Sequence, residues 1–200
     1  MSILMLLELD GVTVEQYAQV NETMGIRGDA DAPDGLLSHA AAITDRGLLI
    51  ADVWDSEESL QRFTEERVGP AMAAAGVPPG AEPQIHEVHN FIPQGSGTDP
   101  AVLMIIESDE FTPELYDRMT SRMPSHVGDG SAHPAASHIA AKKNGGMVFV
   151  DVWDSPETFA RFAEDTIGPA AEGEDVPALE PRFHPLHKTL KGSARAYSTH

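Results

Sequence analysis

The chain has 200 residues, of which 41% are hydrophobic and 22% charged, and this composition is typical of a globular protein with one or two domains. Its formal net charge of −19 argues against nucleic acid and anionic membranes as partners, because both are bound through lysine and arginine. The absence of cysteine excludes disulfides and thiol chemistry. We therefore expect a cytoplasmic protein that binds neither nucleic acid nor membranes.

The chain opens with an apolar run at residues 3–9, which predicts a buried strand. It lacks the basic segment and the small-residue cleavage site of a signal peptide. Thr13 is a typical helix N-cap and predicts a helix that ends near Met24. A loop rich in glycine, aspartate, alanine and proline follows.

The next apolar runs, residues 36–44 and 48–54, are joined by Asp45-Arg46-Gly47 and predict a β-hairpin. Ser56 is the expected N-cap of a second helix, with acidic residues in its first turn. Gly69-Pro70 is expected to end that helix or to bend it into a short extension. After the proline-rich loop at residues 77–80, a fourth strand is expected at residues 82–92.

The second half of the chain repeats the first. The pentapeptide Asp-Val-Trp-Asp-Ser occurs at residues 52–56 and again at 151–155, and the offset of 99 also relates Tyr17 to Tyr116 and His39 to His138. A period this long, seen twice, indicates a domain duplication rather than a solenoid. We predict a first unit at residues 1–94, a linker at 95–100, a second unit at 101–191 and a flexible tail at 192–200.

The element order of each half is βαββαβ, which is typical of a ferredoxin-like, α+β unit with a four-stranded antiparallel sheet and two helices on one face. The strands are apolar on both faces, so the uncovered face of each sheet needs a partner. We therefore predict that the two sheets pack face to face as an intramolecular pseudo-dimeric barrel. Whether two chains then form a further homodimer is left open.

This order, together with a strand that ends in Val-Trp-Asp-Ser and a following helix with acidic residues and phenylalanine, resembles the dimeric α+β barrel superfamily. Within it, the chain is similar to the antibiotic biosynthesis monooxygenase-like proteins. The resemblance covers nearly the whole chain, once per half. It implies a cavity in each half, but it does not select an activity, because the superfamily includes cofactor-free oxygenases, polyketide cyclases and haem-degrading enzymes.

Two aromatic residues and two carboxylates are the first candidates for the cavity. Trp54 and Trp153 match the aromatic residue that lines the substrate cavity in the monooxygenase members. Asp52 and Asp151 share a strand face with them and with apolar residues, and a carboxylate there needs a partner. The alternative is a core tryptophan beside a carboxylate that is paired for structural reasons.

Histidines kept in both halves are the candidate bases. His39 and His138 lie in the middle of the second strand of each half, and an imidazole with an ordinary pKa near ~6.5 can act as a base at neutral pH. A structural histidine is the alternative. We assign His39, His138, Asp52 and Asp151 as candidate catalytic residues. The candidate substrate-binding residues are Trp54, Trp153, His86, His184, Tyr17 and Tyr116.

No metal or cofactor is expected. His86 and His89 are three apart on a strand and so face opposite sides, as do His184 and His187, which prevents either pair from chelating a metal alone. Motifs for flavin, nicotinamide and nucleotides are missing. The predicted helices contain no histidine, which departs from the haem-degrading branch. His126 and His133 lie in the long loop of the second half, where either a solvated loop or a lid is conceivable.

These observations favour a cofactor-independent monooxygenase-like enzyme that acts on a small apolar or aromatic, polyketide-like molecule. A histidine would remove a proton from a phenol or enol, and the resulting anion would react with oxygen or cyclise. A cyclase or isomerase that uses acid-base chemistry is one alternative. A non-catalytic barrel that binds a small ligand or is associated with stress is the other.

Overall fold

The computed structural model describes residues 1–77, 81–124 and 133–192. The first repeat contains β1 (Ile3–Asp10), α1 (Val14–Met24), the 3-10 turn η1 (Asp29–Asp31), β2 (Leu36–Ile43), β3 (Gly47–Trp54), α2 (Glu57–Phe63), η2 (Thr64–Val68), α3 (Gly69–Ala74) and β4 (Gln84–Ile92). The second repeat contains β5 (Val102–Ser108), α4 (Pro113–Arg122), β6 (Ser137–Lys143), β7 (Gly146–Trp153), α6 (Pro156–Phe162), η3 (Ala163–Ile167), α7 (Gly168–Ala171) and β8 (Arg182–Lys191).

The predicted βαββαβ order is therefore present twice, and the strands follow the closed barrel order β1-β3-β2-β8-β5-β7-β6-β4. The pairs β1–β3, β2–β3, β5–β7 and β6–β7 are antiparallel. The predicted fold class, two ferredoxin-like units whose antiparallel strands close into a barrel, is confirmed. Of the expected tail only Gly192 is described, and the loop at 78–80 and His126 lie outside the described residues.

The boundaries of the two compact units of the structure differ from the boundaries of the sequence repeats. Unit 1 comprises Met1–Ile85 and the chain from His187 on, and unit 2 comprises His86–Leu186. The last strand of each repeat is thus divided between the units. Most of β4 lies in unit 2, where it pairs antiparallel with β6, and the start of β8 pairs there with β5. The end of β8 lies in unit 1, where Gly192 donates a backbone hydrogen bond to Leu37 of β2.

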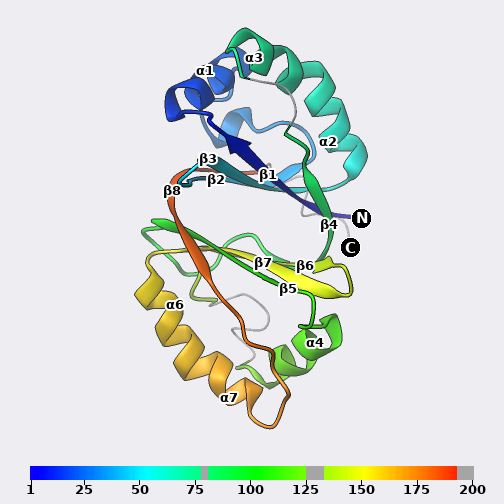
Figure 1. Ribbon diagram of the computed structural model, residues 1–200, viewed down its shortest axis with the longest axis vertical. Coiled ribbons are helices and arrows are strands. Elements are labelled where there is room, and N and C mark those ends of the chain that lie inside the picture. The colour runs from blue at the N-terminus through cyan, green and yellow to red at the C-terminus, as the bar shows by residue number, and fades with distance from the viewer. Residues whose placement is uncertain (78–80, 125–132, 193–200) are drawn as a thin grey trace. The chain divides into compact units, whose positions relative to one another are not determined.

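The helix starts follow the predicted capping residues. Thr13 accepts a hydrogen bond from the Gln16 amide and the Gln16 side chain returns one, which completes a capping box. Thr112, Ser56 and Ser155 accept the corresponding bonds at α4, α2 and α6. These caps orient α1 and α4, which carry Tyr17 and Tyr116, on one face of the sheet in their own unit (Figure 1).

A π-helical turn follows the second helix of each repeat. The turns η2 and η3 each directly precede a Gly-Pro pair, and the chain then stays helical in α3 and α7. Proline lacks the N–H of an α-helical hydrogen bond, and a π turn absorbs this mismatch without ending the helix. Of the two outcomes predicted for Gly69-Pro70, the structure shows the short extension. Val68 and Ile167, the last residues of these turns, face the cavities described below.

Candidate functional site

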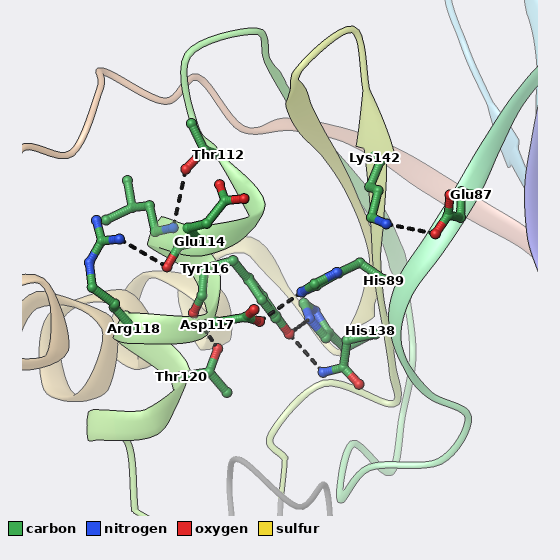
Figure 2. Close-up of polar contacts among 12 residues, drawn as sticks. Glu87, His89, Thr112, Glu114, Tyr116, Asp117, Arg118, Thr120, His138 and Lys142 are labelled. Atoms are coloured by element: carbon green, nitrogen blue, oxygen red, sulfur yellow. Dashed lines mark hydrogen bonds and ion pairs between the residues drawn. The ribbon is translucent and has the colours of Figure 1, made fainter. Parts of the chain in front are cut away.

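A hydrogen-bonded row of three side chains crosses unit 2. His138 of β6 and Asp151 of β7 are cross-strand partners, and His138 Nδ1 lies 2.8 Å from Asp151 Oδ1. The other ring nitrogen, Nε2, lies 2.9 Å from the hydroxyl oxygen of Tyr116 on α4. His138 and Asp151 are only 8% and 4% exposed, so they interact away from bulk solvent. Figure 2 shows Tyr116 pointing from its helix to His138 on the sheet.

Strand β4 contributes Asn90 to this row and places His89 beside it. The Asn90 amide donates to the Tyr116 hydroxyl oxygen at 2.7 Å. His89 Nε2 lies 2.7 Å from Asp117 Oδ1, and its ring meets the edge of Tyr116 with the centroids 5.6 Å apart (Figure 2). The Asn90–Tyr116–His138–Asp151 row, called the relay below, is therefore continuous from β4 to β7.

Unit 1 repeats the three-residue core of the relay. His39 Nδ1 lies 2.6 Å from Asp52 Oδ1, and His39 Nε2 lies 2.7 Å from the Tyr17 hydroxyl. His39 and Asp52 are again cross-strand partners, on β2 and β3. The position that corresponds to Asn90, with an offset of 98, holds Lys188. The two units therefore share Tyr–His–Asp but differ in the fourth residue.

Each Tyr–His–Asp row borders an apolar cavity. The cavity of unit 2 has a volume of about 390 Å³ and that of unit 1 about 460 Å³. In unit 2, Tyr116, His138, Asp151, His133, Asn90 and Thr120 are the polar lining residues among aliphatic and aromatic side chains. Such volumes and linings are typical of small-molecule sites. In unit 1, the cavity is lined by Tyr17, His39, Asp52 and also Trp54.

Two neighbouring histidines of unit 2 have pKa values that are shifted in opposite directions. Burial alone would lower the pKa of His138, but the Asp151 carboxylate and the hydrogen bonds to Asp151 and Tyr116 outweigh it and raise the pKa to about 10. His133, whose ring lies 5.0 Å from that of His138, has its pKa lowered to about 4 by burial and by the neighbouring His138. At neutral pH the unit therefore holds a protonated His138, paired with Asp151, beside a neutral His133.

Comparison with solved structures identifies the fold. Over 95% of this chain and 96% of the other, it is similar to a candidate monooxygenase from Lactobacillus acidophilus NCFM, with 12% identity and a TM-score of 0.67. A second candidate monooxygenase, from Fusobacterium nucleatum subsp. nucleatum ATCC 25586, matches with 9% identity, a TM-score of 0.66 and coverage of 95% and 94%. The chain has the dimeric α+β barrel fold. No family model and no curated protein matches the sequence.

The resemblance predicted from the sequence is thus confirmed for the dimeric α+β barrel fold, over both repeats. Sequence identities of 9% and 12% support an assignment of the fold only, and the chemistry of the site depends on its own residues. Among the described residues, no helix is long and apolar enough to span a membrane. The described part of the chain also contains no group of three or more histidine, aspartate or glutamate side chains placed to hold a metal ion.

The structure places the predicted site residues in two groups. The candidate catalytic residues and the two tyrosines come together as the paired Tyr–His–Asp rows. Trp54 lines the unit 1 cavity, whereas Trp153 does not line the unit 2 cavity but packs against Phe159 and Phe162, which do.

The two other candidate histidines lie outside these groups. His86 lies on β4 with Nδ1 3.2 Å from the Lys142 carbonyl oxygen, and His184 pairs in register with Leu103. Neither of these histidines lines the apolar cavity of unit 1 or that of unit 2, and their role in substrate binding stays a prediction.

Sequence reasoning missed three residues of unit 2. Asn90 and His89 were not assigned to the site of the second repeat, because their strand belongs to the first. His133 was weighed only as part of a loop, yet it is 5% exposed and is held from two sides. The Ala135 amide donates to its Nδ1, and Ser96 donates to its carbonyl oxygen. The sequence feature that could have indicated this position is a histidine just before a predicted strand, and that is weak evidence by itself.

We expect the lowered pKa of His133 to destabilise the protein in acid. The unfolded chain takes up this proton near pH 6.5 but the folded one only near pH 4, so the stability contributed by neutral His133 is complete above pH 6.5 and is lost as the pH falls through about 4. By pH 4 the loss is about 3 kcal/mol. Urea unfolding at pH 7 and pH 4 should show a smaller acid loss for His133→Gln than for the wild type. Equal losses would contradict the assignment.

Proposed function

We propose that this protein is a cofactor-independent acid-base enzyme of the monooxygenase-like kind, acting on a small, neutral, apolar or aromatic molecule. The observation that carries the proposal is the relay, which ends at the wall of an apolar cavity of about 390 Å³. A non-catalytic binder needs only the cavity. A buried carboxylate and imidazole, hydrogen-bonded in one row with a half-buried phenol and amide, cost desolvation, and acid-base chemistry accounts for them.

The first step would be proton transfer from the substrate into the relay. In its unprotonated state, the relay has Asn90 donating to the Tyr116 oxygen, Tyr116 donating to His138 Nε2, and His138 Nδ1–H donating to Asp151. A phenol, enol or acidic C–H in the cavity would transfer its proton to the Tyr116 oxygen while the hydroxyl proton moves to His138. The product is an imidazolium paired with Asp151, and the raised pKa of His138 supports this form of the relay.

The second task would be to stabilise the substrate anion in an apolar cavity. After the transfer, Tyr116 presents a hydroxyl group to the anion, with the His138 imidazolium behind it. His133 supplies a further donor, because its Nδ1 accepts the Ala135 amide and its neutral ring therefore carries the proton on Nε2. A neutral imidazole kept from ionising is a suitable donor to a developing oxyanion.

An electron-rich anion held in this way can react with oxygen without a cofactor. For a methylene group beside an aromatic ring, the balanced reaction is R₂CH₂ + O₂ → R₂C=O + H₂O, in which the substrate supplies all four electrons. The same anion can instead attack a carbonyl group of its own chain or take up a proton at another carbon. The cyclase or isomerase alternative therefore uses the same relay and differs in whether oxygen is consumed.

A bicyclic ketone, 2-tetralone, tests the proposal because its C1 protons are acidic and it is small enough for the cavity. In deuterated buffer, the protein is expected to accelerate deuterium exchange at C1, followed by proton NMR. Oxygen uptake in step with loss of the ketone supports the monooxygenase-like reaction. Exchange without oxygen uptake supports the cyclase or isomerase alternative, and no acceleration of exchange contradicts acid-base catalysis.

A further inference from the structure

A second cavity adjoins the apolar cavity of unit 1. It has a volume of about 410 Å³ and shares Tyr17, Asn21 and Ile26 with the apolar cavity. Its remaining lining residues are Ala18, Glu22, Arg27, His187 and Lys188. This outer cavity therefore brings two permanent cations and one carboxylate together, in a protein whose net charge is −19.

The Lys188 ammonium group has only weak, neutral partners there. Its Nζ lies 3.4 Å from Asn21 Oδ1 and 3.4 Å from the Ile26 carbonyl oxygen, both longer than a normal hydrogen bond of this kind. Within the described part of the chain, no carboxylate lies within ion-pair distance of it. Burial lowers the pKa of Lys188, opposed by the more distant Asp31 carboxylate. A half-buried ammonium group of this kind favours an anion as its partner.

Unit 2 provides the internal comparison. At the position of Lys188 it has Asn90, which is satisfied by the Tyr116 hydroxyl, and at the position of His187 it has His89, which is paired with Asp117. Asp117 in turn corresponds to Ala18, so unit 1 lacks that carboxylate. Asn90 and His89 of unit 2 therefore have partners within that unit, whereas the cation of unit 1 is left facing a cavity.

Each unit buries one indole N–H for which the described residues supply no acceptor, that of Trp54 in unit 1 and that of Trp153 in unit 2, but Trp153 does not line the apolar cavity of its unit. Trp54 lines the apolar cavity of unit 1 and is fully buried, and its indole Nε1–H has no hydrogen-bond partner among the described residues. The Trp54 ring lies 5.3 Å from that of Phe63, which lines the same cavity. A ring-bearing ligand would meet aromatic walls here, and a polar atom on it could accept the indole N–H.

We propose that unit 1 is a separate binding site for an apolar, ring-bearing carboxylate, whose body occupies the apolar cavity and whose carboxylate is held by Lys188 and Arg27. This assigns ligands of different charge to the two units, an organic acid to unit 1 and a neutral molecule to unit 2. The proposal for unit 1 is independent of catalysis in unit 2, because binding of a ligand to unit 1 can be measured whether or not unit 2 is an enzyme.

A matched pair of probes, 2-naphthoate and its neutral carboxamide 2-naphthamide, separates charge from shape. The chain contains two tryptophans, so a ¹⁵N-labelled sample has two indole N–H peaks, which Trp54→Phe assigns. Titration should shift the Trp54 peak, and 2-naphthoate should bind at least about tenfold more tightly than 2-naphthamide. Lys188→Asn, which copies the residue of the other repeat, should reduce this preference to what Arg27 alone supplies, and Lys188→Arg should keep it.

Lys191→Asn is the matched control, because it removes one positive charge from the same strand at a residue that does not line the cavity. It should leave the preference unchanged. Equal affinity for acid and amide in the wild type overturns the proposal, and so does a preference that Lys188→Asn leaves undiminished. It is also overturned if 2-naphthoate shifts only the Trp153 peak or neither peak.

Discussion

Replacing His138 with glutamine is expected to lower the rate of 2-tetralone exchange by about 100-fold or more, because general acid-base catalysis by a positioned side chain contributes about 10²–10⁴ in rate. Glutamine keeps a polar side chain between Tyr116 and Asp151 but cannot take up a proton. The same substitution in the other repeat, His39→Gln, is the matched control. It should change the rate by less than about twofold, since the ligand proposed for unit 1 is an anion and 2-tetralone is neutral.

The pH profile distinguishes a base from a merely structural histidine. The reactive form is neutral His138, and with a pKa of about 10 this form increases with pH until that value is reached. The exchange rate of the wild type should therefore rise about tenfold per pH unit above neutrality and level off near pH 10. His138→Gln should lose this rise, after correction for exchange in buffer. A wild-type rate that is independent of pH removes His138 from the role of base.

The sequence identified all six residues of the two Tyr–His–Asp rows but not their connection. Asp52 was expected to need a partner and His39 to lie on the neighbouring strand, yet the two were treated separately. Counting back from the hairpin turn would have paired them, because residues equally far from the turn face each other on antiparallel strands. The same count pairs His138 with Asp151.

Asn90, His89 and Lys188 could not be assigned from local patterns. Their strands were expected to complete the sheets of their own repeats, whereas β4 from His86 on lies in unit 2 and β8 from His187 on lies in unit 1. Pairing between strands distant in sequence depends on the whole fold, not on the residues of one strand. The difference between Asn90 and Lys188 was visible as divergence between the repeats, but its meaning came from what each side chain faces.

The His138–Asp151 pair provides a second large effect, on stability. Asp151→Leu removes the carboxylate that keeps His138 protonated, which leaves the buried Nδ1 atom without a partner, and His138→Leu leaves the carboxylate buried alone, so each should lower the free energy of unfolding by about 3–5 kcal/mol at pH 7. The double variant buries neither charge, and Tyr116 keeps its bond to Asn90. We expect it to lie within about 1 kcal/mol of the wild type.

Urea unfolding of the four proteins gives the coupling energy of this double-mutant cycle. Additive losses, with the double variant the least stable, would mean that the two side chains are not energetically coupled and would contradict the ion pair. The cycle also separates stability from function. A double variant that is stable but shows no 2-tetralone exchange means that the fold does not require the pair, which leaves chemistry in the cavity as the reason for burying two charges there. A double variant that retains exchange would instead make the pair structural.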